Sequence, residues 1–120
     1  MRKRLLIVED DDLNRELLVQ LFEDRYEIGV ASDGAAAVTL AARVEPDLVL
    51  MDIGLPVMSG LDAVRAIRAA DGPRVPIVAV SGRVLPEDRD RALEAGVDAF
   101  LPKPIDVISI VDLVDSAVGE

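Results

Sequence analysis

Three short runs of this sequence are apolar at every position, and they restrict most strongly what the chain can fold into. The runs are Leu5–Val8, Leu48–Met51 and Ile77–Val80. A strand with one face in water alternates apolar and polar residues, whereas a strand covered on both faces is apolar throughout. Short runs of Val, Ile and Leu are typical of inner strands in a parallel sheet that has helices on both faces. The sequence therefore predicts an α/β protein.

Two further strand candidates fit the edges of such a sheet. Tyr26–Val30 alternates in polarity, and Ala99–Leu101 is short and runs into Pro102, which lacks the N–H that a central strand needs. Helical patterns separate and follow the strands, at Leu13–Asp24, Ala35–Val44, Leu61–Ala70, Glu87–Ala95 and Asp106–Val118.

This alternation predicts a (βα)5 doubly wound open parallel sheet with the flavodoxin-like strand order 2-1-3-4-5. A length of 120 residues suits a single domain over residues 1–120 with one core. Strands 1 and 3 are then neighbours where the strand order reverses. Ligands of such sheets bind beyond the carboxyl ends of the strands at that point.

The composition excludes several classes of function. The net charge is −10, which argues against direct nucleic-acid binding, since neutralising phosphates requires a basic surface. The chain has no Cys and no His, so it offers neither a thiolate nucleophile nor an imidazole base, and no usual zinc ligands. It also shows no membrane-spanning run and no secretory signal, so we expect a cytoplasmic protein with no membrane partner.

Polar residues follow four of the predicted strands, within two residues of each strand's end. Glu9 and Asp10 follow the first, Asp52 the third, Ser81 the fourth and Lys103 the fifth. The carboxyl ends of parallel strands share one edge, so these side chains should converge. Each has an ordinary explanation when taken singly, as a turn acid or a surface lysine. Together, however, three carboxylates repel unless a proton or a cation bridges them, and Mg²⁺ prefers such oxygen ligands.

The segments LLIVEDDDLNREL, PDLVLMDIGLPVMSGLDAVRAIR, PIVAVSG and ALEAGVDAFLPKPI resemble the receiver domain of two-component response regulators. The resemblance spans essentially the whole chain. It implies that Asp52 accepts a phosphoryl group from a histidine kinase or a His-containing phosphotransfer protein. It also implies that Glu9, Asp10, Asp52 and the backbone carbonyl of Gly54 bind Mg²⁺.

The same resemblance assigns roles to residues of the fourth and fifth strands. Lys103 and Ser81 would contact the phosphoryl group, and Ser81 and Phe100 would form a switch that responds to it. Phe100 stands where the family more often has Tyr, and Glu9 where Asp is commoner. The Lys103–Pro104 bond would be a cis peptide. Such a domain is a phosphoacceptor rather than an enzyme, with at most slow self-phosphorylation and self-dephosphorylation.

The partner surface is predicted at the fourth and fifth helices. Glu87–Ala95 is mostly charged, and Leu93 is its main apolar anchor, so we expect this helix and the Ser81–Leu85 loop to rearrange on phosphorylation. On a helical wheel the last helix has a core stripe of Val107, Ile110, Val111, Val114, Ala117 and Val118.

Ile108 and Leu113 fall outside that stripe, one on each margin of the polar face, and are predicted to contact a partner or a second copy of the chain. The resemblance implies a downstream output protein or domain, and a homodimer through the fourth and fifth helices. It fits a stand-alone regulator as well as a receiver from a larger protein such as a hybrid kinase.

Three alternative functions fit the sequence less well. A degenerate receiver that serves only as an interaction module would lack phosphorylation residues, which are present here. An aspartate-nucleophile phosphohydrolase carries a second Asp two residues after the first, and that position is Gly54. A flavodoxin-like nucleotide or flavin binder would have a Gly- or Ser/Thr-rich loop after the first strand, where this chain has EDDD.

Overall fold

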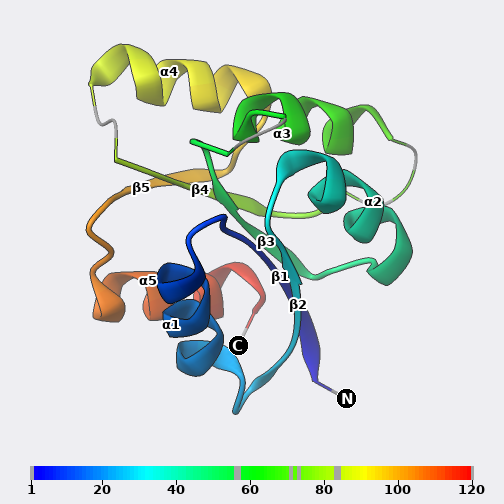
Figure 1. The fold of residues 1–120 in the computed structure, drawn as a ribbon, viewed down its shortest axis with the longest axis vertical. Coiled ribbons are helices and arrows are strands. Elements are labelled where there is room, and N and C mark those ends of the chain that lie inside the picture. Colours follow the sequence, from blue (N-terminus) through cyan, green and yellow to red (C-terminus); the bar gives the residue numbers. More distant parts are fainter. Residues whose placement is uncertain (1, 56–57, 71, 73, 83–84, 120) are drawn as a thin grey trace.

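The structure is a computed structural model that describes residues 2–55, 58–70, 72, 74–82 and 85–119. Strands and helices alternate along these residues (Figure 1). The strands are β1 (Lys3–Val8), β2 (Tyr26–Ala31), β3 (Leu48–Asp52), β4 (Ile77–Ser81) and β5 (Ala99–Pro102). The helices are α1 (Asp12–Phe22), α2 (Gly34–Val44), α3 (Gly60–Ala69), α4 (Pro86–Ala95) and α5 (Val107–Ala117). Each predicted element is present, with bounds that differ by one or two residues.

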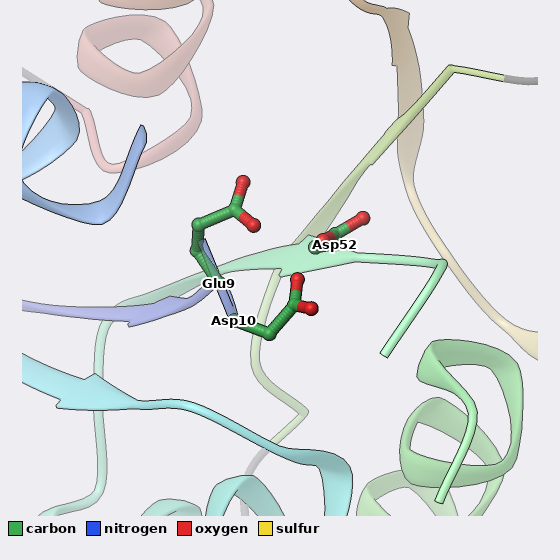
Figure 2. A group of neighbouring side chains, drawn as sticks. All are labelled: Glu9, Asp10 and Asp52. Carbon is green, nitrogen blue, oxygen red and sulfur yellow. The ribbon is translucent and has the colours of Figure 1, made fainter. Parts of the chain in front are cut away.

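The strands form one parallel sheet in the order β2-β1-β3-β4-β5, which confirms the predicted topology. β1 and β3 are neighbours, with Val8, the last residue of β1, opposite Met51, which lies one residue before the end of β3. Glu9 and Asp10 after β1 therefore meet Asp52, the last residue of β3, at one edge of the sheet (Figure 2).

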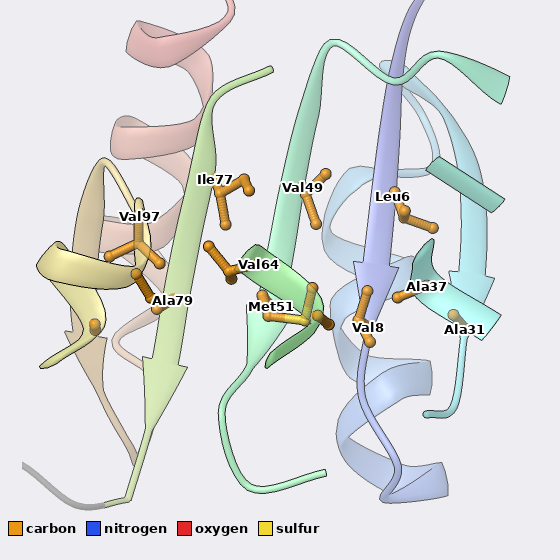
Figure 3. Packing of buried hydrophobic residues seen from close by; sticks show 13 residues of the cluster. Leu6, Val8, Ala31, Ala37, Val49, Met51, Val64, Ile77, Ala79 and Val97 are labelled. Atoms are coloured by element: carbon orange, nitrogen blue, oxygen red, sulfur yellow. The ribbon is translucent and has the colours of Figure 1, made fainter. Parts of the chain in front are cut away.

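Helices cover both faces of the sheet. α2, α3 and α4 lie on one face, and α1 and α5 on the other (Figure 1). Side chains of β1 point alternately to the two faces, with Leu6 and Val8 in the core under α2–α4 and Leu5 and Ile7 in the core under α1 and α5. Figure 3 shows the first of these cores. This two-sided burial explains why the inner runs are apolar throughout, since a fully buried side chain of this size contributes roughly 1.5–3 kcal/mol.

No helix in the described residues combines the length and apolar character needed to cross a bilayer. This agrees with the sequence, in which apolar runs are too short for a span.

The apolar anchor of α4 differs from the prediction. Leu93 is 43% exposed, whereas Ala92 and Ala95 are 1% and 7% exposed and face the core. Residues three apart share a face of a helix, and Leu93 points about 100° away from Ala92. Since alanine side chains bury little area, α4 is held to the sheet by small apolar contacts.

The helical phase predicted for α5 is correct at its centre and wrong at its margins. Ile110 and Val114 are fully buried, but Val107 and Ala117, at the two ends of the helix, are exposed. Leu113 is half-buried and packs against the core under α1 and α5, so its predicted place outside the core is wrong. It lies three residues after Ile110, and the apolar stripe of a core-facing helix is wide enough to include it.

Candidate functional site

The carboxyl edge of the sheet brings together the acids and the lysine that the sequence singled out. Glu9 directly follows β1, Asp52 ends β3, Ser81 ends β4 and Lys103 directly follows β5. Lys103 Nζ lies 3.2 Å from Glu9 Oε1 and 3.4 Å from Asp52 Oδ2. The predicted convergence of these strand ends is therefore present.

Glu9, Asp10 and Asp52 form an acid cluster (Figure 2). One carboxylate oxygen from each residue lies within 4.8 Å of the others. Glu9 and Asp52 are 1% and 6% exposed, whereas Asp10 is exposed to solvent. The cluster is thus buried on one side and open on the other. A set of hard oxygen donors at this spacing fits Mg²⁺, which binds one or two carboxylates and keeps several waters.

The carboxyl group of Glu9 is crowded. Burial, followed by its interaction with Asp52, raises the pKa of Glu9 to about 7 from 4.5, although the Asp11 N–H and Lys103 partly oppose this. The Asp11 N–H donates to Glu9 Oε2 at 3.2 Å, and the Lys103 ammonium donates to Oε1 at 3.2 Å. Bringing these acids together therefore costs free energy that a bound cation would offset.

Lys103 is held in place from both its backbone and its side chain. Its N–H donates to the carbonyl of Ser81 at 2.8 Å, which ties the end of β5 to β4. Burial lowers the pKa of Lys103, but the negative charge of Asp52 and Glu9 outweighs it, and the net pKa is raised. The ammonium therefore stays protonated beside Asp52. The Lys103–Pro104 peptide bond is cis, as predicted.

The backbone after Asp52 folds back against the end of β3. The Gly54 N–H donates to Asp52 Oδ1 at 3.1 Å, and the Gly60 N–H donates to the carbonyl of Ile53 at 3.0 Å. A Cβ atom at Gly60 would lie 2.4 Å from the carbonyl oxygen of Asp52. A glycine at this position thus lets α3 begin directly against the strand that ends at Asp52.

The two residues predicted to form a switch line the same pocket. Ser81 is 5% exposed and Phe100 is half-buried. The pocket is lined by Ile53, Leu61, Ser81, Asp88, Arg91 and Phe100. Two of these residues, Asp88 and Arg91, belong to α4. A movement of the Ser81 or Phe100 side chain would therefore alter the pocket that α4 also lines.

One contact at the site was not predicted from the sequence. Arg15, on α1, donates from Nη1 to the backbone carbonyl of Glu9 at 3.0 Å. In the sequence Arg15 looks like an ordinary surface residue that pairs with Asp12 three positions earlier. A contact to a backbone atom six residues away has no signature in residue type or spacing.

The family model of the response regulator receiver domain matches residues 5–115. Curated relatives include the polar-differentiation response regulator DivK of Brucella anthropi, 36% identical over 122 residues that cover 100% of this chain and 99% of the relative. DivK of Brucella ovis is 35% identical with the same coverage.

Solved structures agree with these matches. The receiver domain of a sensor histidine kinase from Pseudomonas aeruginosa PAO1 superposes with a TM-score of 0.91 at 34% identity, covers 100% of both chains, and has a magnesium ion coordinated in its active-site cleft. A CheY-like receiver domain protein from Methanospirillum hungatei superposes with a TM-score of 0.90 at 26% identity, over 99% of this chain and 95% of the other. This chain belongs to the response regulator receiver domain family of two-component signalling.

Proposed function

We propose that residues 1–120 form one receiver domain that acts as a phosphorylatable switch, with Asp52 as the phosphoacceptor. The donor would be a phosphohistidine on a histidine kinase or on a His-containing phosphotransfer protein. The observation that carries this proposal is the buried Asp52 carboxylate in the acid cluster, with the Lys103 ammonium 3.4 Å away. The absence of His from the chain agrees with a donor histidine on another protein.

In the proposed step a carboxylate oxygen of Asp52 attacks the phosphorus atom. The P–N bond of the phosphohistidine breaks, and its electron pair leaves with the imidazole. A carboxylate nucleophile requires no general base, and phosphoryl transfer depends mainly on positioning and charge stabilisation. Lys103 lies where its positive charge offsets the charge that builds up beside Asp52.

The residues proposed to hold Mg²⁺ are Glu9, Asp10, Asp52 and the carbonyl of Gly54. The spacing of the three carboxylates and the metal-bound cleft of the Pseudomonas receiver domain support this proposal. When bound, Mg²⁺ would neutralise the phosphoryl oxygens during transfer.

A phosphohydrolase function is the weaker candidate. That chemistry uses a side-chain acid two residues after the nucleophile, and Gly54 occupies that position with a backbone N–H bonded to Asp52. A phosphoacceptor that is modified once, rather than an enzyme with turnover, agrees better with this arrangement. A pure interaction module would have no need for the acid cluster and the lysine together.

Incubating the protein with acetyl phosphate and Mg²⁺ tests the proposed function. We expect mass spectrometry to show the gain of one phosphoryl group, dependent on Mg²⁺ and absent in Asp52→Asn. Asp62→Asn is the matched control, because Asp62 is an exposed acid at the start of α3 and should leave the reaction unchanged. A mass gain that persists in Asp52→Asn would contradict the assignment of the phosphoacceptor.

We further propose that phosphorylation changes the conformation around Ser81, Phe100 and α4. The pocket shared by these three parts and the small apolar anchor of α4 support this. The Ser81–Leu85 loop belongs to the same prediction, although residues 83–84 of it lie outside the described part of the chain.

Hydrogen exchange measures this change directly. We expect exchange in α4 and around Phe100 to differ between the phosphorylated and unphosphorylated protein, with α2 as an internal reference that stays unchanged. Ser81→Ala should still accept the phosphoryl group but show a smaller difference in α4. Identical exchange in the two states of the wild type would refute the proposed switch.

Ile108 is the residue we propose for a partner contact or homodimer through α4 and α5. It lies in the first turn of α5 and is 74% exposed. We expect Ile108→Ser to weaken phosphorylation-dependent dimerisation in sedimentation experiments, or binding to a kinase or output protein, while changing stability by less than about 0.5 kcal/mol. Leu113→Ser, at a half-buried site, should instead lower stability clearly. If Ile108→Ser leaves every association unchanged, Ile108 is only a singly exposed apolar residue.

A further inference from the structure

The side chain of Arg15 reaches from α1 back to the turn that carries the acids. Its Nη1 donates to the carbonyl of Glu9 at 3.0 Å, and its Nη2 lies 2.5 Å from Asp12 Oδ1. Arg65 on α3 makes the same pairing with Asp62, three residues earlier, at 2.9 Å. The Arg15 side chain is 24% exposed and that of Arg65 is 55% exposed. Arg15 thus adds to an ordinary helix pair a part-buried hydrogen bond to the backbone of the site.

The carbonyl that Arg15 binds belongs to the peptide unit between Glu9 and Asp10. That unit is planar, so holding its oxygen also sets the direction of the Asp10 N–H and, through it, the course of the backbone at Asp10. The Glu9 N–H donates to the carbonyl of Ala31 at 3.0 Å, which fixes the other side of Glu9. The Asp11 N–H then bonds to the Glu9 carboxylate. Arg15 therefore binds the peptide unit that joins Glu9 and Asp10, two residues of the acid cluster.

We propose that Arg15 is a positioning residue for the acid cluster, holding the Glu9–Asp10 peptide so that both carboxylates face the same space as Asp52. The inference rests on the proposed Mg²⁺-dependent phosphorylation. It goes beyond it by assigning the geometry of the acid pair to an α1 side chain whose hydrogen bonds among the described residues go to the Glu9 backbone carbonyl and to Asp12, which lies outside the cluster.

The guanidinium group suits this task better than an ammonium group. Its planar fork of donors binds a carbonyl and a carboxylate at once, with a defined angle between them. Lysine keeps the charge but is a point donor on a flexible stem. Arg15→Lys therefore keeps the positive charge and removes the planar pair of donors, so it tests the two contributions separately.

The charge of Arg15 alone would act in the opposite direction. A positive group near a cation site weakens cation binding, so its removal should strengthen Mg²⁺ binding if charge were its only effect. Loss of positioning should weaken Mg²⁺ binding. The sign of the change in Arg15→Gln therefore distinguishes the two roles.

Isothermal titration of Mg²⁺ into the full chain tests the proposal with Arg15→Lys, Arg15→Gln and the matched control Arg65→Gln. We expect the two Arg15 variants to bind Mg²⁺ about tenfold more weakly, as is usual when a group that orients metal ligands is removed. Arg65→Gln should bind like the wild type. Because the Arg15 side chain is partly exposed on α1, its variants should fold, and urea unfolding checks this.

A second measurement uses the metal-free protein. Hydrogen exchange of the Asp11 amide, which bonds to the Glu9 carboxylate, should be faster in Arg15→Lys and unchanged in Arg65→Gln. If Arg15→Lys matches the wild type in both Mg²⁺ affinity and Asp11 exchange, or if Arg15→Gln binds Mg²⁺ more tightly, the positioning role is overturned. If the wild type itself binds no Mg²⁺, the proposed function fails, and the Asp11 exchange still decides the role of Arg15.

Discussion

Replacing Gly60 with alanine is expected to lower the free energy of unfolding by about 3 kcal/mol, at the upper end of the usual cost of overpacking. The added Cβ would lie 2.4 Å from the carbonyl oxygen of Asp52 and 2.6 Å from the Cα of Ile53. Both are backbone atoms at the end of an inner strand. The Ile53 N–H donates to the carbonyl of Val80 at 3.0 Å, so this strand end cannot move away without breaking the ladder with β4.

Urea unfolding of Gly60→Ala beside Gly29→Ala measures this effect. A Cβ at Gly29 would meet Leu40 Cδ2 at 3.6 Å and Leu6 Cδ1 at 3.7 Å, which are ordinary contacts with side chains. The control should therefore change stability by less than about 1 kcal/mol, because it adds contacts and restricts the unfolded chain. Equal stability of the two variants would mean that α3 does not approach β3 as closely as described.

Asp52→Asn is expected to have the second large effect, a gain of about 2 kcal/mol in the stability of the metal-free protein. Asp52 lies in an acid cluster whose oxygens are within 4.8 Å, and the pKa of Glu9 is raised to about 7 by burial and by Asp52. Two like charges at this distance repel by roughly 3 kcal/mol at an effective dielectric constant of about 20, and Lys103 offsets part of this. Replacing the charged Asp52 by neutral Asn removes the part of this repulsion that Lys103 does not offset.

The gain should depend on pH, with a sign that follows from Glu9. A carboxyl group whose pKa is higher in the folded state than its ordinary 4.5 binds its proton more tightly when folded. The stability that comes from this tighter proton binding is present below about pH 4.5 and is lost as the pH rises to about 7, so the free energy of unfolding falls over that range. Asp52→Asn removes part of this penalty, so its advantage over the wild type should be larger at pH 8 than at pH 5.

Unfolding in urea with EDTA at these two pH values checks both statements, and Asp62→Asn serves as a control with an exposed acid. Adding Mg²⁺ should raise the melting temperature of the wild type, because a ligand of the native state stabilises it, and should raise that of Asp52→Asn much less. A variant that is less stable than the wild type at pH 8 would show that Asp52 is not under repulsion.

The order and direction of the strands follow from the apolar runs and from the alternation of strands and helices along the sequence. Runs such as Leu48–Met51 require cover on both faces, and intervening helices force parallel strands with crossovers of one hand, so few strand orders remain. The same logic predicted that Glu9, Asp52 and Lys103 would meet, since carboxyl ends of parallel strands share an edge. These features depend on each element's own composition and position in the chain.

Which side chains are covered, and by what, was decided only by the tertiary structure. Leu93, expected from composition to be the main apolar anchor of α4, is exposed because Ala92 and Ala95 occupy the face that meets the sheet. Leu113 packs against the core because a helical wheel gives the direction of a side chain but not the width of the surface packed against it. The contact of Arg15 with the Glu9 carbonyl and the close approach at Gly60 depend on distances between separate elements. Residue type and spacing determine the elements and their order, whereas contacts between elements follow from how all of them pack at once.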